Sequence, residues 1–210
     1  MSQAPKQRGK FIVLEGIDGA GKSTHIDFIA ANIRSAYGVE VLITREPGGT
    51  PLAEKIREFV LHEPMDVQTE VLLVAAGRRD HIQRAIGPAL ERGDWVLCDR
   101  FIDSTRAYQG GGGGVDLGWI DAVNREVCGS IEPDRVILFD VPAHIAAQRR
   151  GGRGGQEDRF EAQDVAYFER VRSVYLRQMR PGSQEKTAIL NAELDVSRIQ
   201  KELHKIILNL

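Results

Sequence analysis

The chain has 210 residues, with 28 Lys and Arg against 30 Asp and Glu, and a formal net charge of −2. This length predicts one domain over residues 1–210, and the near-neutral charge excludes the global basic field of nucleic-acid binders. No apolar run has the length of a signal peptide or a membrane span, and the two cysteines lack the spacing of a metal site or a disulfide framework. We therefore expect a cytoplasmic protein that binds neither nucleic acid nor membrane, with Cys98 and Cys128 as buried thiols.

Short apolar runs alternate with longer helical patterns along the chain. Strands are predicted at 11–15, 39–44, 95–99, 134–140 and 187–190, and helices at 23–37, 50–62, 67–92, 117–128, 143–149, 162–180 and 193–208. Such continuously apolar strands are typical of a parallel sheet that is covered on both faces. The alternation predicts a doubly wound α/β domain with about five parallel strands, and ligands beyond the carboxyl ends of those strands.

Two glycine-rich stretches interrupt this alternation. Residues 110–114 are five consecutive glycines, and residues 151–155 interleave glycine with Arg153. Because predicted elements continue on both sides in so short a chain, we expect mobile active-site loops here rather than domain boundaries.

The strongest chemical signal is GIDGAGKS at 16–23, which has the full Walker A spacing between the first predicted strand and the first predicted helix. Its glycines allow backbone N–H groups to converge on a β-phosphate, and the helix N-terminus adds positive potential. Lys22 is expected to reach the β- and γ-phosphate oxygens, and Ser23 to bind Mg²⁺. The predicted ATP-binding residues of this loop are Gly16, Ile17, Asp18, Gly19, Ala20, Gly21, Lys22, Ser23 and Thr24.

Four segments together resemble the bacterial thymidylate kinases. They are GIDGAGKST at 16–24, TREPGGT at 44–50, CDRFIDSTRAYQGGG at 98–112 and EDRFE at 157–161. The resemblance covers nearly the whole chain and implies a P-loop NTPase-type fold, a homodimer, and transfer of the γ-phosphoryl group of MgATP to dTMP. The products would be dTDP and ADP, in support of dTTP synthesis. A kinase for another (deoxy)nucleoside monophosphate stays open as an alternative, as does a nucleotide-hydrolysing switch, although the sequence has no N-K-x-D motif.

The resemblance and the side-chain chemistry together assign one set of residues to the acceptor nucleotide. In the family the acid at Asp18 faces the acceptor sugar, Arg57 contacts the acceptor phosphate, and Arg78 contacts the base. The full dTMP-binding set is Asp18, Glu46, Arg57, Val74, Arg78, Arg100, Thr105, Tyr108 and Gln109. Asp99 ends a predicted strand and is expected to organise the metal together with Ser23, while Arg100 clamps phosphate oxygens.

The arginine-rich stretch at about 149–160 resembles the family's lid. Phosphoryl transfer needs cationic charge on the equatorial oxygens, and in one branch of the family an arginine of the P-loop supplies it. This chain has Gly19 there, so we expect the lid to supply that charge, from Arg153 first and Arg150 second, with Arg149 near ATP. The expected catalytic residues are Lys22, Asp18, Arg100, Arg153 and Arg150.

One position departs from the family pattern. Relatives usually carry Phe four positions before the base-contacting arginine, where its ring stacks on thymine, and this chain has Val74. Stacking of a base on an aromatic ring is worth about 1–3 kcal/mol in other systems. We therefore expect weaker or altered recognition of the base, with Phe101 as a nearby aromatic that could compensate in part.

Overall fold

The computed structural model describes residues 7–151, 158–179 and 186–210. In these residues five parallel strands form one sheet with the order β2-β3-β1-β4-β5. The strands are β1 Phe11–Glu15, β2 Val41–Arg45, β3 Trp95–Asp99, β4 Arg135–Asp140 and β5 Thr187–Asn191. Val13 of the central strand β1 lies beside Cys98 of β3 and Val136 of β4. The predicted parallel α/β sheet is confirmed.

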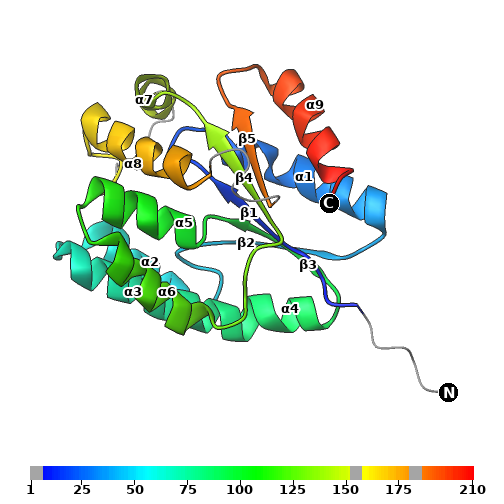
Figure 1. Ribbon diagram of the computed structural model, residues 1–210, viewed down its shortest axis with the longest axis horizontal. Helices are drawn as coiled ribbons and strands as arrows, with labels where there is room; N and C mark the ends of the chain where they lie inside the picture. The colour runs from blue at the N-terminus through cyan, green and yellow to red at the C-terminus, as the bar shows by residue number, and fades with distance from the viewer. Residues whose placement is uncertain (1–6, 152–157, 180–185) are drawn as a thin grey trace.

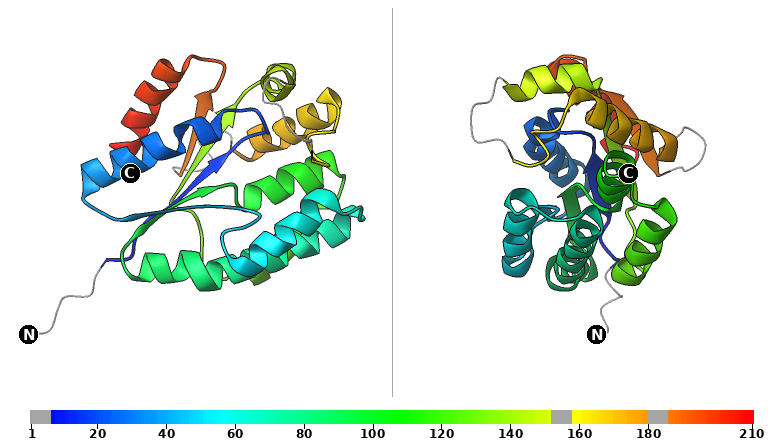
Figure 2. Two further views of the ribbon diagram at one scale, coloured as in Figure 1. Left: turned by 180° about the vertical axis from the view of Figure 1, so that it is seen from behind. Right: turned by 90° about the vertical axis from the view of Figure 1, so that its left-hand side faces the viewer.

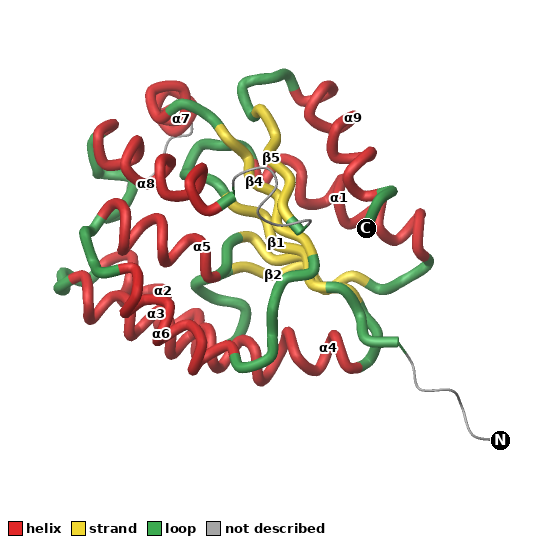
Figure 3. Tube along the Cα trace, in the orientation of Figure 1, coloured by secondary structure: helices red, strands yellow, loops and turns green. Residues whose placement is uncertain are grey.

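Helices cover both faces of this sheet. They are α1 Lys22–Tyr37, α2 Pro51–His62, α3 Val67–His81, α4 Gly87–Glu91, α5 Ile102–Thr105, α6 Leu117–Cys128, α7 Ala143–Gly151, α8 Val165–Gln178 and α9 Val196–Ile207, with π-helical segments η1 Ile82–Ile86 and η2 Arg106–Gly112. Helices α1 and α9 pack together on one face, and α4 with α2, α3 and α6 lies on the other (Figures 1 and 2). In Figure 3 the strands gather between these two helical layers. Among the described helices, none has the length and apolar character needed to cross a membrane.

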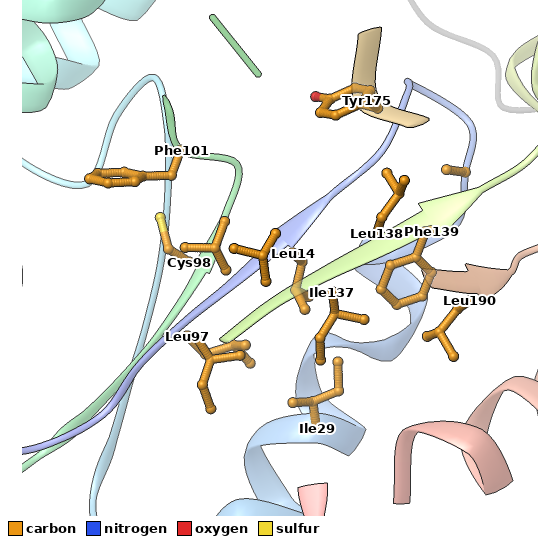
Figure 4. Close-up of a cluster of buried hydrophobic side chains, with 14 of the residues drawn as sticks. Leu14, Ile29, Leu97, Cys98, Phe101, Ile137, Leu138, Phe139, Tyr175 and Leu190 are labelled. Carbon is orange, nitrogen blue, oxygen red and sulfur yellow. The ribbon is translucent and has the colours of Figure 1, made fainter. Parts of the chain in front are cut away.

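The core is centred on β1. Phe11 to Leu14 are fully buried, because helices pack on the sheet above and below them. Figure 4 shows Leu14, Leu97 and Ile137, from the three central strands, close to Ile29 of α1. This double burial explains the continuous apolar runs in the sequence. It also gives the loops at the carboxyl ends of β1 and β3 a rigid base.

Helix α1 begins differently from five other helices of the described chain. Those helices start at a side chain that accepts a hydrogen bond from the backbone N–H three residues later, namely Thr50, Asp66, Asp116, Asp164 and Asp195. The N-cap of α1 is Gly21, with no side-chain cap and no acid in the first turn. The first N–H groups of α1 are therefore free to bind an anion.

The single helix predicted over 67–92 contains a π-helical turn. Helix α3 ends at His81, η1 follows as Ile82–Ile86, and α4 continues as Gly87–Glu91. Pro88 has no N–H with which to continue the regular hydrogen-bond ladder, which accounts for the local change of helical period.

The prediction of a mobile loop at 110–114 is wrong for the first three glycines, which lie in the helical segment η2. A Cβ atom on Gly111 would lie 2.5 Å from the Val174 side chain, and one on Gly112 would lie 2.5 Å from the Tyr167 ring. These glycines therefore serve the close packing of η2 against α8 rather than mobility.

Candidate active site

The loop between β1 and α1 has the backbone of a phosphate-binding turn. Gly16, Gly19 and Gly21 have φ angles of 140°, 88° and 91°, which only glycine adopts readily. A Cβ atom on Gly19 would lie 2.4 Å from the carbonyl oxygen of Ala146 in α7. This packing leaves no room for a P-loop arginine at position 19.

Lys22 is a buried cation held under this loop. Its Nζ donates to the Gly16 carbonyl oxygen at 3.0 Å and lies 3.7 Å from Oδ1 of Asp99. Burial lowers the pKa of Lys22, and the Arg100 charge acts in the same direction, while the Asp99 and Asp18 carboxylates oppose both. The ammonium group is thus fixed in place, and the nearby carboxylates neutralise its positive charge only in part. This suits a group that binds an anion.

A pocket of about 520 Å³ opens above the loop and is called the P-loop pocket here. Its lining residues are Asp18, Gly19, Gly21, Lys22, Ser23, Arg45, Glu46, Arg57, Asp99 and Arg100. Four of these ten residues are cationic and three are acidic, and the uncapped N-terminus of α1 adds further positive potential. The P-loop pocket therefore suits a polyphosphate.

A second pocket, of about 600 Å³, adjoins the first and is called the acceptor pocket here. All nine residues predicted for the acceptor nucleotide line it: Asp18, Glu46, Arg57, Val74, Arg78, Arg100, Thr105, Tyr108 and Gln109. Apolar side chains complete its wall, among them Val60, Leu61, Phe101 and Phe160. Residues from six separate segments of the sequence are thus brought together.

The two pockets meet at a charged junction formed by Asp18, Glu46, Arg57 and Arg100, each of which lines both. Arg100 Nη2 donates to Asp18 Oδ1 at 2.7 Å, and the Tyr108 hydroxyl donates to Asp18 Oδ2 at 2.7 Å. Burial alone would raise the pKa of Asp18, but the Arg100 and Lys22 charges outweigh it and hold that pKa below its usual range. Asp18 is therefore ionised at neutral pH.

The far end of the acceptor pocket is organised by Arg78, which is 2% exposed. Its guanidinium donates to Glu46 Oε2 at 2.7 Å, to Asn124 Oδ1 at 2.7 Å and to Thr105 Oγ1 at 3.0 Å. Burial opposes the charge, but Glu46 outweighs it and raises the pKa of Arg78. His81 supports Glu46 from behind, with Nδ1 3.1 Å from Oε1. Arg78 therefore stays charged and held in one orientation.

A family model for thymidylate kinase matches residues 14–203. The chain belongs to the thymidylate kinase family. The thymidylate kinase of Cupriavidus pinatubonensis is 47% identical over 201 residues, which are 95% of this chain and 98% of that relative. That of Paraburkholderia phytofirmans is 47% identical over 203 residues, with the same shares. The crystal structure of thymidylate kinase from Ehrlichia chaffeensis matches with a TM-score of 0.76 and 32% identity, over 95% of this chain and 99% of that one. The chain is thus a kinase with the fold of this family.

The arginines of the predicted lid in this thymidylate kinase family member differ in their contacts. Arg159 donates to the Val60 carbonyl oxygen and to Glu70. Arg150 Nη1 donates to the Asp18 carbonyl oxygen at 2.7 Å, and its guanidinium lies 4.0 Å from the Phe168 ring centroid. Arg149 instead donates to the Ala192 carbonyl oxygen at 2.9 Å and lines neither pocket. Arg153, the first candidate from the sequence, lies outside the described residues. Among the described arginines of the predicted lid, Arg150 is the one that bonds to the P-loop.

Five of the predicted ATP-binding residues line neither pocket, namely Gly16, Ile17, Ala20, Thr24 and Arg149. Ile17 and Ala20 are buried beneath the loop and can offer only backbone N–H groups, and Thr24 is exposed on α1. Their assignment to ATP stays a prediction.

Several residues of the site were missed by sequence reasoning. Asp158 and Phe160 line the acceptor pocket, and both stand in the EDRFE segment at 157–161, to which no individual roles were given. Glu15 and Tyr175 form a buried pair behind Arg100 and are separated by 160 positions. Proximity to a motif could have suggested Phe160, but no local signal pairs Glu15 with Tyr175.

Proposed function

We propose that this chain transfers the γ-phosphoryl group of ATP to the 5′-phosphate of dTMP and releases ADP and dTDP. The observation that carries the proposal is the contact between the two pockets. A cationic P-loop pocket and a pocket with an apolar wall share Asp18, Glu46, Arg57 and Arg100. This arrangement suits a polyphosphate donor and a nucleoside monophosphate acceptor whose phosphate groups meet end to end.

Catalysis then consists of positioning and charge neutralisation. Lys22 and the N-terminus of α1 hold the donor phosphates, while Arg57 and Arg100 hold the acceptor phosphate. The acceptor phosphate oxygen is already a competent nucleophile, so no covalent enzyme intermediate is needed. Asp18 keeps Arg100 oriented and, being ionised, can accept a hydrogen bond from a sugar hydroxyl. Arg150, already on the P-loop, supplies charge to the transferred group.

Ser23 and Asp99 fit a Mg²⁺ ion that is carried by the nucleotide. Both line the P-loop pocket, and the buried Oδ1 of Asp99 accepts no hydrogen bond. In the described part of the chain no three His, Cys, Asp or Glu side chains gather as a metal site, which suits an ion held mainly by substrate phosphates. Mg²⁺ neutralises phosphate charge when it is bound.

The base of the acceptor would lie between Arg78, Thr105 and Gln109 on the polar side and Val74 on the apolar side. The ring of Phe101 is already engaged, by the Arg78 guanidinium at 5.2 Å and by Phe11 edge-on at 5.0 Å. Phe160 is half-buried, lines the same pocket and packs against the apolar cluster that includes Val74. We therefore assign to Phe160 the aromatic contact that Val74 cannot make.

Replacing Phe160 with alanine should raise the KM for dTMP about tenfold and leave the KM for ATP within twofold, because one aromatic contact with the base is lost. Steady-state kinetics with each substrate varied in turn will measure this. A Val74→Phe substitution in the Phe160→Ala background is the matched test, since it returns an aromatic ring to the same apolar wall. An unchanged KM for dTMP in Phe160→Ala would contradict the assignment.

The acceptor is tested by ADP release from MgATP with a panel of substrates. The panel is thymidylate, deoxyuridylate, deoxycytidylate, uridylate, deoxyguanylate and thymidine, with a control that lacks acceptor. We expect selective turnover with thymidylate. Preference for another monophosphate would support phosphoryl transfer but show that thymidylate is not the preferred acceptor. Equal turnover without acceptor would indicate a nucleotide-hydrolysing protein.

Further expectations stay predictions. They are a homodimer, a cytoplasmic location, a single domain over 1–210, and a lid at about 149–160, of which residues 152–157 lie outside the described chain.

A further inference from the structure

Arg100, at the junction of the two pockets, is held in an unusual backbone conformation. Its φ angle is 73°, in the left-handed region that non-glycine residues seldom adopt. Its Nη1 donates to the Gly16 carbonyl oxygen at 2.8 Å, and its Nη2 donates to Asp18 at 2.7 Å and to the Tyr108 hydroxyl at 3.0 Å. A conformation of this kind persists only when the surrounding structure enforces it.

A buried cluster of hydroxyl and carboxylate groups lies directly behind this guanidinium. Arg100 Nη1 donates to the Ser104 hydroxyl and to the Tyr175 hydroxyl, each at 3.2 Å. The Tyr175 hydroxyl donates to Glu15 Oε2 at 2.9 Å, and the Ser104 hydroxyl donates to the same oxygen at 2.6 Å. Oε1 of Glu15 accepts from the backbone N–H of Phe101 at 2.8 Å. One carboxylate thus holds both the hydroxyls that touch the guanidinium and the backbone that follows Arg100.

Two members of this cluster, Glu15 and Tyr175, are too deeply buried to act on a substrate directly. Glu15 is 0% exposed and Tyr175 is 1% exposed, and neither lines either pocket. In Figure 4 the ring of Tyr175 borders the apolar cluster, and its hydroxyl oxygen lies at the end that points away from Leu138 and Phe139. Burial, reinforced by the nearby Asp103 carboxylate, raises the pKa of Glu15 to about 7. A core built for stability alone would avoid burying this carboxylate.

Helix α8 links this cluster to the arginine of the lid. Tyr175 reaches Arg100 from α8. Phe168, about two turns earlier on the same face of that helix, lies 4.0 Å from the Arg150 guanidinium. Both arginines donate hydrogen bonds to Asp18, Arg100 to its carboxylate and Arg150 to its carbonyl oxygen. The helix that follows the lid therefore supports both guanidinium groups that face the transferred phosphate.

We propose that Tyr175, with Glu15 and Ser104, is a positioning unit that fixes the Arg100 guanidinium at the junction of the two pockets. The inference rests on the proposed function in giving Arg100 a substrate phosphate to bind. Tyr175 and Glu15 act through Arg100 and never touch the nucleotide. Because Tyr175 belongs to α8, the position of Arg100 also depends on how α8 packs against the rest of the domain.

Tyr175→Phe removes only the hydroxyl and keeps the ring in the core. We expect kcat/KM for dTMP to fall about tenfold, with the KM for ATP within twofold of wild type, because a hydrogen bond to a charged group is lost. Tyr37→Phe is the matched control. Its hydroxyl donates to the Ile207 carbonyl oxygen at 2.7 Å, far from the site, so it should lower Tm similarly and leave kcat/KM unchanged.

A double-mutant cycle separates positioning from a general structural role. In an Arg100→Lys background the further change Tyr175→Phe should lower kcat/KM less than twofold, because the guanidinium on which Tyr175 acts is absent. A tenfold loss in both backgrounds, or no loss in either, would overturn the inference.

Crystal structures of Tyr175→Phe and Tyr37→Phe give a readout that needs no turnover. We expect the Arg100 guanidinium to leave the Gly16 carbonyl oxygen in the first variant and to stay in the second. An unmoved guanidinium in Tyr175→Phe overturns the inference. Absence of dTMP phosphorylation by the wild-type protein would instead refute the proposed function, and the two crystal structures would still decide the role of Tyr175.

Discussion

Lys22→Ala should abolish measurable phosphoryl transfer, with a fall in kcat of at least about a thousandfold. Lys22 is the buried cation under the P-loop, where its Nζ lies 3.0 Å from the Gly16 carbonyl oxygen and faces the P-loop pocket. Its removal leaves the donor phosphates without their nearest fixed positive charge, and that charge matters most when negative charge redistributes during transfer. Coupled measurement of ADP release with dTMP will give kcat.

Two controls make the Lys22 result interpretable. Circular dichroism and Tm will show whether the fold is kept, because loss of Lys22 also removes a partner of Asp99. Lys201→Ala changes an exposed lysine on α9 and should leave kcat unchanged. Turnover of a folded Lys22→Ala protein within tenfold of wild type would show that the P-loop pocket is not where transfer occurs.

Arg150→Ala should lower kcat by about a hundredfold or more, with only a modest change in ATP binding. Arg150 is held at the loop by the Asp18 carbonyl oxygen at 2.7 Å and by the face of Phe168. A guanidinium placed on the transferred group acts mainly in the transition state, so kcat falls more than affinity. Rapid-quench kinetics with ATP titration will separate the two effects.

The comparison with other arginines decides which residue supplies this charge. Arg177→Ala, an exposed change on α8, should leave kcat unchanged. A large loss in Arg153→Ala with no loss in Arg150→Ala would move the role to Arg153, the first candidate from the sequence. If neither variant loses kcat, the lid does not provide the cation.

The sequence was sufficient to predict the elements that carry the P-loop. Strands β1 and β3 are buried on both faces, so their apolar runs have sharp ends, and β1 and β3 were predicted with the bounds that the structure shows. The glycines at 16–21 are needed because the loop requires positive φ angles there. This requirement depends only on neighbouring residues, so the sequence alone can reveal it. The nine residues predicted for the acceptor came from the resemblance together with side-chain chemistry, and the structure brings all nine into one pocket.

Other features depend on contacts between distant segments, so the sequence alone did not reveal them. The helical conformation of 102–112 is fixed by packing on α8, and the glycines that suggested a mobile loop are there because α8 approaches closely. From the local sequence, Glu15 is simply the last residue of an apolar strand. Its partner Tyr175 looks like any other aromatic residue of the core. Only the folded chain shows that the Tyr175 hydroxyl bonds both to Glu15 and to Arg100.

The most direct test of the central claim follows the transferred phosphoryl group itself, by ³¹P NMR of ATP, Mg²⁺ and dTMP mixed with the protein. Transfer between the two pockets predicts that ADP and dTDP appear in equal amounts, without inorganic phosphate, and that Lys22→Ala gives neither. Accumulation of inorganic phosphate with dTMP unchanged would contradict the claim and would identify hydrolysis as the reaction at this P-loop.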